Sequence, residues 1–315
     1  MKIVFMGTPQ AAVPSLERLI ADGHKFVAVY TQPDRPSGRG NKITFSPVKE
    51  CAVSHDIPVF QPLKIETPDA LELFASHKAD VAIVVAYGRI LPETFLNAFP
   101  KKAINVHFSL LPKYRGAAPV NWAIVRGETE SGVTTMMMDV GLDTGDMLLQ
   151  RSVSIGSEET SVELMQRLSL VGAELLSETL SDLDEITPTP QNHDLATFAP
   201  IMKREDGVVD WSMTAKEISD RVRGFQPFPS TFTYIDGTKL TLWRAFACDM
   251  PAEANPGEGR IVEAHGDIFI VSCGSGTALK LDEVQPEGKR RMPVRDFLNG
   301  AKPQIGAVLG GFPKD

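Results

Sequence analysis

The strongest constraint on the fold is an alternation of strand-like and helix-like segments in the first half of the 315-residue chain. Nearly continuous apolar runs predict buried strands at residues 2–6, 25–31, 81–87, 104–108 and 132–138. Strands that are apolar on both faces and alternate with helices form a mostly parallel sheet that is covered on both sides. The sequence therefore predicts an α/β domain with a doubly wound sheet.

Two features argue against a bound dinucleotide and against a metal. The turn after the first strand, Gly7-Thr8-Pro9-Gln10, lacks the G-x-G-x-x-G spacing that seats a pyrophosphate at the start of the next helix. The three cysteines are far apart and odd in number, so neither a disulfide framework nor a zinc site is indicated. We predict no dinucleotide cofactor and no metal.

The composition is that of an ordinary water-soluble protein, with 43% hydrophobic and 23% charged residues. No stretch approaches the roughly 18 apolar residues of a membrane span, and the chain starts directly on a strand-like run, so we expect a cytoplasmic protein. A net charge of -8 argues against a surface coated in basic residues, although local basic patches remain compatible with it. Nothing resembles a coiled-coil seam, and we expect a monomer.

A second, smaller domain is predicted in the last third of the chain. Thr160 and Glu163 form a capping-box pattern before an apolar helical stripe, which ends near Leu180. Polar, proline-punctuated residues follow and are interpreted as an extended linker. Residues 211–223 are predicted as one helix, and short alternating strands between glycine turns then favour a small OB-like β-barrel. The predicted parts are a catalytic domain at 1–189, a linker at 190–206 and a β-barrel domain at 207–315.

An amide and an imidazole lie two positions apart at the end of the strand predicted over residues 104–108. Because side chains alternate across a strand, Asn105 and His107 share one face. The carboxyl ends of strands in open α/β sheets line ligand crevices, and Pro112 and Gly116 turn the chain directly afterwards. The pair predicts a site, whereas the plainer alternative is that neighbouring loop backbone satisfies both groups.

An acidic, glycine-rich loop at residues 139–146 is positioned in the sequence to bring a carboxylate to His107. An asparagine amide donates without titrating, and a carboxylate orients an imidazole and favours its charged form. Together these groups suit an oxyanion formed by attack on a carbonyl. Two alternatives are less favoured: Ser109 as a nucleophile lacks a G-x-S-x-G elbow, and a metal site at His107 lacks a second histidine at ligand spacing.

Two segments resemble the 10-formyltetrahydrofolate-dependent formyltransferases. They are N-V-H-x-S-L-L-P-x-x-R-G at residues 105–116 and D-V-G-L-D-T-G-D at residues 139–146. The resemblance implies a Rossmann-like domain that transfers a formyl group from 10-formyltetrahydrofolate to an amine, with Asn105, His107 and Asp143 as catalytic residues. Asn105 and protonated His107 would stabilise the oxyanion, while Asp143 would hold the imidazolium and assist removal of the amine proton.

The resemblance also implies a folate site, which is built from the loop after His107 and from an earlier segment. The implied folate-binding residues are Ser109, Leu110, Leu111, Pro112, Tyr87, Gly88, Ile90 and Leu91. Phe108 departs from the family, whose members often carry a small residue such as glycine there. If its side chain faces the core, as strand alternation predicts, the chemistry survives; if it faces the crevice, it narrows the site.

Two basic features bear on the acceptor, because related enzymes formylate a ribonucleotide or an amino sugar. Residues 33–42 resemble an insertion that tRNA-specific members wedge against the acceptor stem, and the C-terminal domain resembles the family's tRNA-binding barrel. The resemblance implies transfer to the α-amino group of methionine on initiator tRNA, with an amino-sugar nucleotide as the alternative acceptor. Implied tRNA contacts are Arg35, Arg39, Lys42, Lys289, Arg290 and Arg291, although residues 289–291 could also be only a solvated surface.

Overall fold

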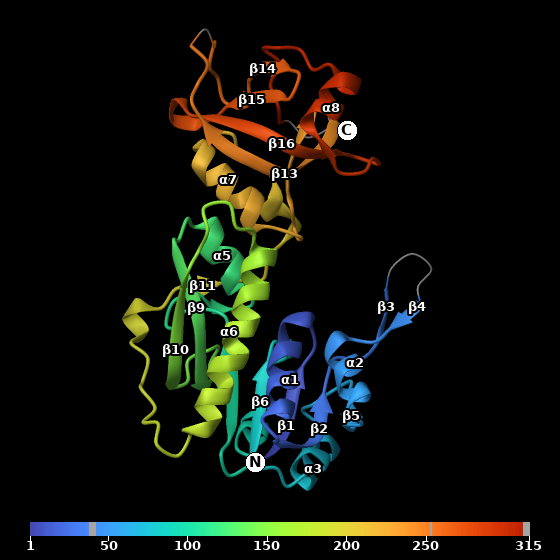
Figure 1. Cartoon of the computed structure of the whole chain (residues 1–315), viewed down its shortest axis with the longest axis vertical. Coiled ribbons are helices and arrows are strands. Elements are labelled where there is room, and N and C mark those ends of the chain that lie inside the picture. The colour runs from blue at the N-terminus through green and yellow to red at the C-terminus, as the bar shows by residue number, and fades with distance from the viewer. Residues whose placement is uncertain (38–41, 253, 311–315) are drawn as a thin grey trace. The chain divides into compact units, whose positions relative to one another are not determined.

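A computed structural model describes residues 1–37, 42–252 and 254–310, and the chain divides into two units (Figure 1). The N-terminal unit comprises Met1–Pro119, Glu130–Ser154 and Met165–Pro200. The C-terminal unit comprises Val120–Thr129, Ile155–Leu164 and Ile201–Asp315. Within the described ranges, no helix has the length and apolar character needed to span a bilayer.

The N-terminal unit is built on a seven-stranded sheet of order β10-β9-β7-β6-β1-β2-β5. Every pairing from β5 to β7 is parallel, and β9 and β10 add an antiparallel edge. The strands are β1 Lys2–Gly7, β2 Lys25–Tyr30, β5 Val59–Phe60, β6 Val81–Val85, β7 Ala103–His107, β9 Glu130–Met137 and β10 Met147–Ser154. The predicted mostly parallel α/β sheet is confirmed.

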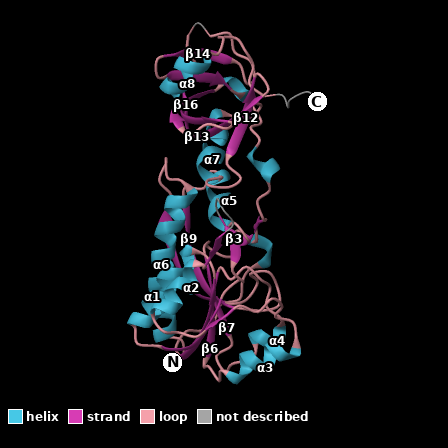
Figure 2. Ribbon diagram, turned by 90° about the vertical axis from the view of Figure 1, so that its right-hand side faces the viewer, coloured by secondary structure: helices cyan, strands magenta, loops and turns pink. Residues whose placement is uncertain are grey.

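Helices cover both faces of this sheet (Figure 2). They are α1 Val13–Ala21, α2 Pro47–Ser54, α3 Pro68–Ser76, α4 Glu93–Leu96 and, from Met165 on, α6 Ser161–Ser181. Helix α5 Pro119–Val125 belongs, from Val120 on, to the C-terminal unit. On the face of α3 and α4, Phe74 and Phe95 lie with ring centroids 4.4 Å apart in one apolar cluster with Val4 and Val84. Burial of these rings against branched strand residues stabilises the layer through removal of apolar surface from water.

The predicted capping box at the start of α6 is confirmed. The Glu163 carboxylate accepts from the backbone N and the hydroxyl of Thr160, both at 2.8 Å, and the Thr160 hydroxyl accepts from the Glu163 backbone N at 3.3 Å. These bonds satisfy amide groups that the first turn of a helix leaves without partners. The predicted stripe is buried at Leu164, Leu168 and Leu175.

The C-terminal unit contains an antiparallel sheet of order β12-β13-β16-β15-β14, with β17 paired to β16. Its strands are β12 Thr231–Ile235, β13 Thr238–Cys248, β14 Ile261–His265, β15 Ile268–Ser272, β16 Ala278–Pro286 and β17 Met292–Pro293, and its helices are α7 Ala215–Gly224 and α8 Val294–Ala301. Ile218 and Val222 of α7 share an apolar core with Leu242 and Leu281 of the sheet. The small OB-like β-barrel domain predicted for this part of the chain is confirmed as a separate, antiparallel and strand-rich domain.

The helix predicted over residues 211–223 begins later, at Ala215. Backbone oxygens of Trp211 and Met213 accept from the N of Gly274, at 2.9 and 2.8 Å, and so are bonded outside any helix. Thr214 then caps α7 through a reciprocal box with Glu217. The buried Trp211 belongs to the core and not to the helix, because capping at Thr214 overrides the apolar periodicity.

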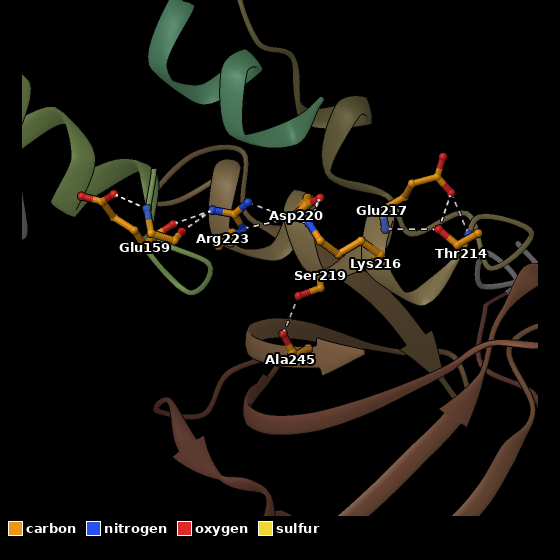
Figure 3. A network of polar contacts seen from close by, with 9 residues as sticks. Glu159, Thr214, Lys216, Glu217, Ser219, Asp220, Arg223 and Ala245 are labelled. Atoms are coloured by element: carbon orange, nitrogen blue, oxygen red, sulfur yellow. Dashed lines mark hydrogen bonds and ion pairs between the residues drawn. The ribbon is translucent and has the colours of Figure 1, made fainter. Parts of the chain in front are cut away.

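A buried polar network fixes α7 within the C-terminal unit (Figure 3). The Arg223 guanidinium donates to Asp220 at 2.8 and 3.0 Å, and its Nη1 donates to the backbone oxygen of Glu159 at 3.0 Å. Lys216 also contacts the Asp220 carboxylate. Both members of the Arg223 and Asp220 pair are buried, so loss of the Asp220 side chain would leave the Arg223 guanidinium buried without its carboxylate partner, whereas loss of Arg223 would leave Asp220 paired with Lys216.

The segment predicted as a linker contains regular structure. It includes the short helix η2 His193–Leu195, strand β11 Phe198–Ala199 and the short helix η3 Arg204–Gly207. Strand β11 pairs in parallel with β8 Arg115–Gly116, directly after the predicted folate loop. Gln191 and Ala199 are buried, so residues 190–200 pack as part of the N-terminal unit.

Candidate active site

The predicted amide and imidazole lie at the carboxyl end of β7, the strand between β6 and β9. Asn105 is 8% exposed and His107 is 5% exposed. His107 pairs with Thr134 of β9, and Asn105 pairs with Val84 of β6 and Met136 of β9. Because these polar side chains come from a strand held on both edges, their backbone has little freedom to move.

The imidazole of His107 contacts two groups. Its Nε2 lies 3.0 Å from the backbone oxygen of Tyr114. A carbonyl oxygen only accepts, so Nε2 carries a proton and donates it to Tyr114. Nδ1 lies 3.6 Å from Oδ2 of Asp143. The structure therefore brings together the histidine and the aspartate that the resemblance to the family indicated.

The 139–146 loop carries Asp143, and other residues of the loop form hydrogen bonds and close contacts that fix its conformation. The Asp139 carboxylate accepts from the Gly141 backbone N at 3.0 Å and from the Thr144 hydroxyl at 2.6 Å. A Cβ on Gly145 would lie 1.8 Å from the backbone oxygen of Met137, so only glycine fits there. Asp143 adopts a left-handed φ of 53°. Asp139 thus stabilises the conformation of the loop, and Asp143 is the carboxylate that lies next to His107.

Gly116 gives Asp143 a second partner. Its backbone N donates to Asp143 Oδ2 at 2.7 Å. A Cβ at position 116 would lie 2.6 Å from the backbone oxygen of Ala199, and the residue has φ +119°. The glycine of the R-G pair is therefore required for the close approach of β11, and this approach sets the N–H that orients the carboxylate.

The alternative in which Ser109 is a nucleophile is wrong. The Ser109 hydroxyl is buried and donates to the backbone oxygen of Lys113 at 2.6 Å, while His107 has other partners. Among the residues that the structure describes, no three histidine, cysteine or acidic side chains are grouped to hold a metal ion.

The side chain of Phe108 faces helix α6 and not the site. It is 5% exposed, and a Cβ added to Gly172 of α6 would lie 3.4 Å from the Phe108 ring and 3.1 Å from Val106. The alternation of β7 therefore continues through position 108, and glycine in α6 leaves room for the large ring. The departure from the family at this position is accommodated in the core.

The first predicted folate segment, residues 109–112, is a loop tied to β9 and β10. The Thr134 hydroxyl donates to the Ser109 oxygen at 2.7 Å and accepts from the Leu111 N at 3.2 Å. Gln150 donates to the Leu111 oxygen at 2.8 Å. Leu111 is buried and Leu110 packs over Gly132, while Pro112 is half-buried.

The second predicted folate segment, residues 87–91, alternates between core and surface. Tyr87 and Leu91 are buried in the cluster of α3 and α4, whereas Ile90 is 80% exposed and Gly88 is exposed. Burial raises the pKa of the Tyr87 phenol, whose hydroxyl has no hydrogen-bond partner among the described groups. Met138, which precedes the 139–146 loop, packs on the same cluster. Residues 87–91 and the residue before the 139–146 loop therefore pack on the same apolar cluster.

A hollow of about 530 Å³ lies beside the 139–146 loop. Its lining includes Met138, Asp139 and Gly145 from the loop, and Lys101 and Lys102 from the turn before β7. None of Asn105, His107 and Asp143 lines it, so this hollow is separate from the predicted catalytic residues.

The predicted basic contacts divide into two groups. Arg35 is exposed on β3 Arg35–Ser37, which pairs with β4 Lys42–Thr44, where Lys42 lies. Arg39 falls outside the described residues. At the base of the hairpin, the Lys49 ammonium contacts Asp34 at 2.5 Å and, with Gln61, holds the pKa of that carboxyl below its usual value. Asp34, the residue before the hairpin, is thus held in place by Lys49 and Gln61.

The second basic group lies in the turn between β16 and β17. Lys289 and Arg290 are exposed. Arg291 is also exposed but forms an ion pair with Glu283, and its guanidinium lies 5.1 Å from the Trp243 ring centre. The three cations are therefore not equivalent, because one of them already has a carboxylate partner.

Sequence reasoning missed the groups that orient His107 and Asp143. Tyr114 contacts His107 through its carbonyl, and Gly116 contacts Asp143 through its N–H, and a side-chain pattern does not indicate contacts made by the backbone. Gln191 donates to the backbone oxygen of Asp143, but it lies in a stretch whose prolines indicated an extended linker. The pairing of β8 with β11 brings the segment after Gln191 next to Arg115 and Gly116, and it is visible only in the structure.

Comparison with known proteins places the chain in a family. Residues 1–180 match a family described as formyl transferase, and residues 201–302 match the formyl transferase C-terminal domain. Proteins called methionyl-tRNA formyltransferase are 46% identical in Alkaliphilus oremlandii, over 98% of this chain and 100% of the relative, and 49% identical in Citrifermentans bemidjiense, over 98% and 96%. The relative of this description in Koribacter versatilis is 50% identical over 98% and 99%.

Solved structures share the fold at lower identity. The sugar 3N-formyl transferase WlaRD, solved with dTDP and 5-N-formyl-THF, superposes with a TM-score of 0.66 at 19% identity, over 92% of this chain and 99% of that one. An N-formyltransferase from Helicobacter canadensis, in complex with folinic acid and dTDP-3-aminofucose, gives 0.64 at 20% identity, over 89% and 98%. With family matches in both units and nearly full-length relatives, the chain belongs to the formyl transferase family.

Proposed function

We propose that this protein transfers the formyl group of 10-formyltetrahydrofolate to the α-amino group of methionine carried by initiator tRNA. The observation that carries the proposal is identity of 46–50% along nearly the whole chain to proteins called methionyl-tRNA formyltransferase. The sugar formyltransferases are only 19–20% identical and support the fold alone. We also propose that the enzyme acts as a monomer. Its site of action would be the cytoplasm, where initiator tRNA is prepared for translation.

The trio supplies the chemistry that formyl transfer needs. When the amine attacks the formyl carbon, the carbonyl oxygen becomes negative and requires preorganised donors. The Asn105 amide is one donor. His107 Nε2 is committed to Tyr114, so Nδ1 is the nitrogen left for the reacting oxygen. The 3.6 Å distance from Nδ1 to Asp143 is too long for a committed hydrogen bond and leaves this N–H available.

Asp143 acts on both proton and charge. Its carboxylate balances the charge of the imidazolium that donates to the oxyanion, and it accepts the proton that the attacking amine must lose, directly or through one water. The N–H of Gly116 holds Oδ2, so Oδ1 is the oxygen that remains for the proton. Collapse of the tetrahedral species then breaks the bond from the formyl carbon to the folate nitrogen, which takes up a proton as it leaves.

The folate is assigned to two segments, residues 87–91 and residues 109–112. Tyr87 and Leu91 anchor the first segment, while Ile90 presents an exposed apolar side chain for a flat ring system. In the second segment, Ser109 and Leu111 have backbone oxygens already bonded to Thr134 and Gln150, so they shape the loop. Leu110 and Pro112 complete this assignment.

Formylation assays test the acceptor. The protein is incubated with 10-formyltetrahydrofolate and either methionyl initiator tRNA or an amino-sugar nucleotide, and the formylated product is followed. We expect product with the tRNA only. Formylation of the sugar nucleotide without formylation of the tRNA would overturn the proposal.

Arg39→Ala tests the basic hairpin. We expect about a tenfold loss of kcat/KM for the tRNA with an unchanged KM for the folate, because a contact to the tRNA stem acts on one substrate only. Steady-state kinetics with each substrate varied in turn make the measurement, with Arg35→Ala as a companion variant on the described part of the hairpin. An equal loss with both substrates would count against this role.

A further inference from the structure

One short segment contacts both loops that carry the catalytic groups. Residues 190–200, here called the connecting segment, lie far from Asn105, His107 and Asp143 in sequence and belong to the same unit. Two of its side chains, Gln191 and Thr197, bond to backbone groups that adjoin Asp143 and His107. Neither side chain has an evident role in the transfer chemistry itself.

Gln191 connects the catalytic loop to a buried arginine. Its Nε2 donates to the backbone oxygens of Asp143 at 3.0 Å and of Gly145 at 2.7 Å. Its Oε1 accepts from Nε and Nη2 of Arg115 at 3.1 and 2.7 Å. Gln191 is 5% exposed and Arg115 is 4% exposed, so these bonds are shielded from water.

The partners of Gln191 allow only one orientation of its amide. A guanidinium donates and cannot accept, whereas backbone carbonyls accept and cannot donate. The amide oxygen must therefore face Arg115, and the amide nitrogen must face the catalytic loop. A glutamate of the same size would keep the contact with Arg115 but would lose both donors to the loop.

Thr197 acts on His107 through Tyr114. The Thr197 hydroxyl accepts from the Tyr114 backbone N at 2.9 Å, and the Tyr114 oxygen accepts from His107 Nε2 at 3.0 Å. Tyr114 has a left-handed φ of 62°, and its neighbour Arg115 donates its backbone N to the Thr197 oxygen at 2.9 Å. The side chain and the backbone of Thr197 together fix the position of the Tyr114 carbonyl, which accepts the hydrogen bond from His107.

We propose that Gln191 and Thr197 are positioning residues for formyl transfer. Gln191 fixes the backbone position of the Asp143 loop. Thr197 fixes the carbonyl that accepts from Nε2–H of His107, so that the ring directs Nδ1, which carries a proton in the imidazolium form, to the reacting oxygen. The inference rests on the proposed function, and it makes the connecting segment part of the catalytic apparatus.

Gln191→Glu tests the first half of the proposal. We expect kcat to fall by about 10²-fold, with KM for both substrates within about threefold, because misplacement of a catalytic group by about 1 Å has this cost. The matched control is Gln226→Glu in the C-terminal unit, where Nε2 also donates to two backbone oxygens, of Val222 at 3.1 Å and of Trp243 at 2.8 Å. Both glutamines are buried.

Thermal unfolding of both glutamate variants accompanies the kinetics. A purely structural role predicts that Gln191→Glu lowers Tm as Gln226→Glu does and leaves kcat per folded molecule unchanged, and this result would overturn the proposal. Loss of kcat in Gln191→Glu, in a protein that is folded at the assay temperature, supports it.

Thr197→Val and Thr197→Ser test the second half. Valine removes the acceptor at nearly constant volume, whereas serine keeps it. We expect kcat to fall about tenfold in Thr197→Val and to be restored in Thr197→Ser. Nitrogen-15 NMR of the histidine rings gives a readout that packing alone would not move: the neutral His107 ring should be the Nε2–H form in the wild type and in Thr197→Ser, and a mixture of both tautomers in Thr197→Val. An unchanged tautomer in Thr197→Val would overturn this half.

Failure of the positioning role and failure of the proposed function give different results. If the wild type formylates another amine in place of methionyl-tRNA, the function is wrong, and the same variants still report on positioning with that amine. If the wild type formylates methionyl-tRNA and the variants match it in kcat, the function stands and the positioning role falls.

Discussion

At the scale of single residues, the charge of Asp143 carries a testable part of the chemistry. Asp143→Asn keeps the volume and an oxygen for the Gly116 N–H, but removes the negative charge and the proton acceptor beside His107. We expect kcat to fall by about 10²-fold or more with little change in KM, as for loss of a general base. Asp146→Asn removes the same charge from an exposed position of the same loop and should stay within about threefold of the wild type. Similar losses in both variants would point to loop charge alone.

The residue scale also shows where sequence reasoning ends. Placement of Asn105 and His107 on one face followed from strand alternation, which is a local property of β7. The residues alone did not distinguish Asp143 from Asp139 in the acidic loop, and only the family pattern did. Gln191 could not be found in this way, because its role depends on contacts to residues 48 and 46 positions away.

At the scale of elements, the packing of β7 against α6 explains how the chain tolerates Phe108. We expect Phe108→Ala to destabilise the fold by about 3–5 kcal/mol, since it empties a filled position in the core, and to leave KM for the folate unchanged. Urea unfolding and folate kinetics make the two measurements. A large change in the folate KM with normal stability would mean that the ring reaches the site.

The prediction of a helix over residues 211–223 was wrong at its start for a related reason. Trp211 packs in the core of the C-terminal unit and does not belong to the apolar face of a helix.

At the scale of the whole molecule, a net charge of -8 means that tRNA binding must come from local cations. In the turn after β16, Arg290 is exposed while Arg291 already pairs with Glu283. Arg290→Ala should reduce the slope of log K against log salt by about one, and Arg291→Ala should reduce it less. Filter-binding titrations over a salt series provide the slopes. Equal slopes of log K against log salt for both variants and the wild type would mean that the tRNA does not contact the turn after β16.

The molecule as a whole should lose stability as pH falls. Burial lowers the pKa of His77, whose Nε2 lies 2.8 Å from the Tyr30 hydroxyl, below its ordinary value of 6.5. The unfolded chain therefore binds more protons than the folded one below pH 6.5, so stability falls as pH decreases through this range. Hydrogen bonds from Thr160 and from Thr214 lower the pKa of Glu163 and of Glu217 below 4.5, so their contribution is present above that pH and is lost as pH falls further.

Urea unfolding at pH 7.5, 5.5 and 3.5 separates the two steps of this decline. His77→Gln removes the titrating ring, so it should flatten the loss of stability between pH 7.5 and 5.5 while leaving the loss between pH 5.5 and 3.5 unchanged, because the capping carboxylates still titrate there. The same decline above pH 5.5 in His77→Gln would assign the first step to another group, of which His24, whose pKa burial also lowers, is the one to replace next.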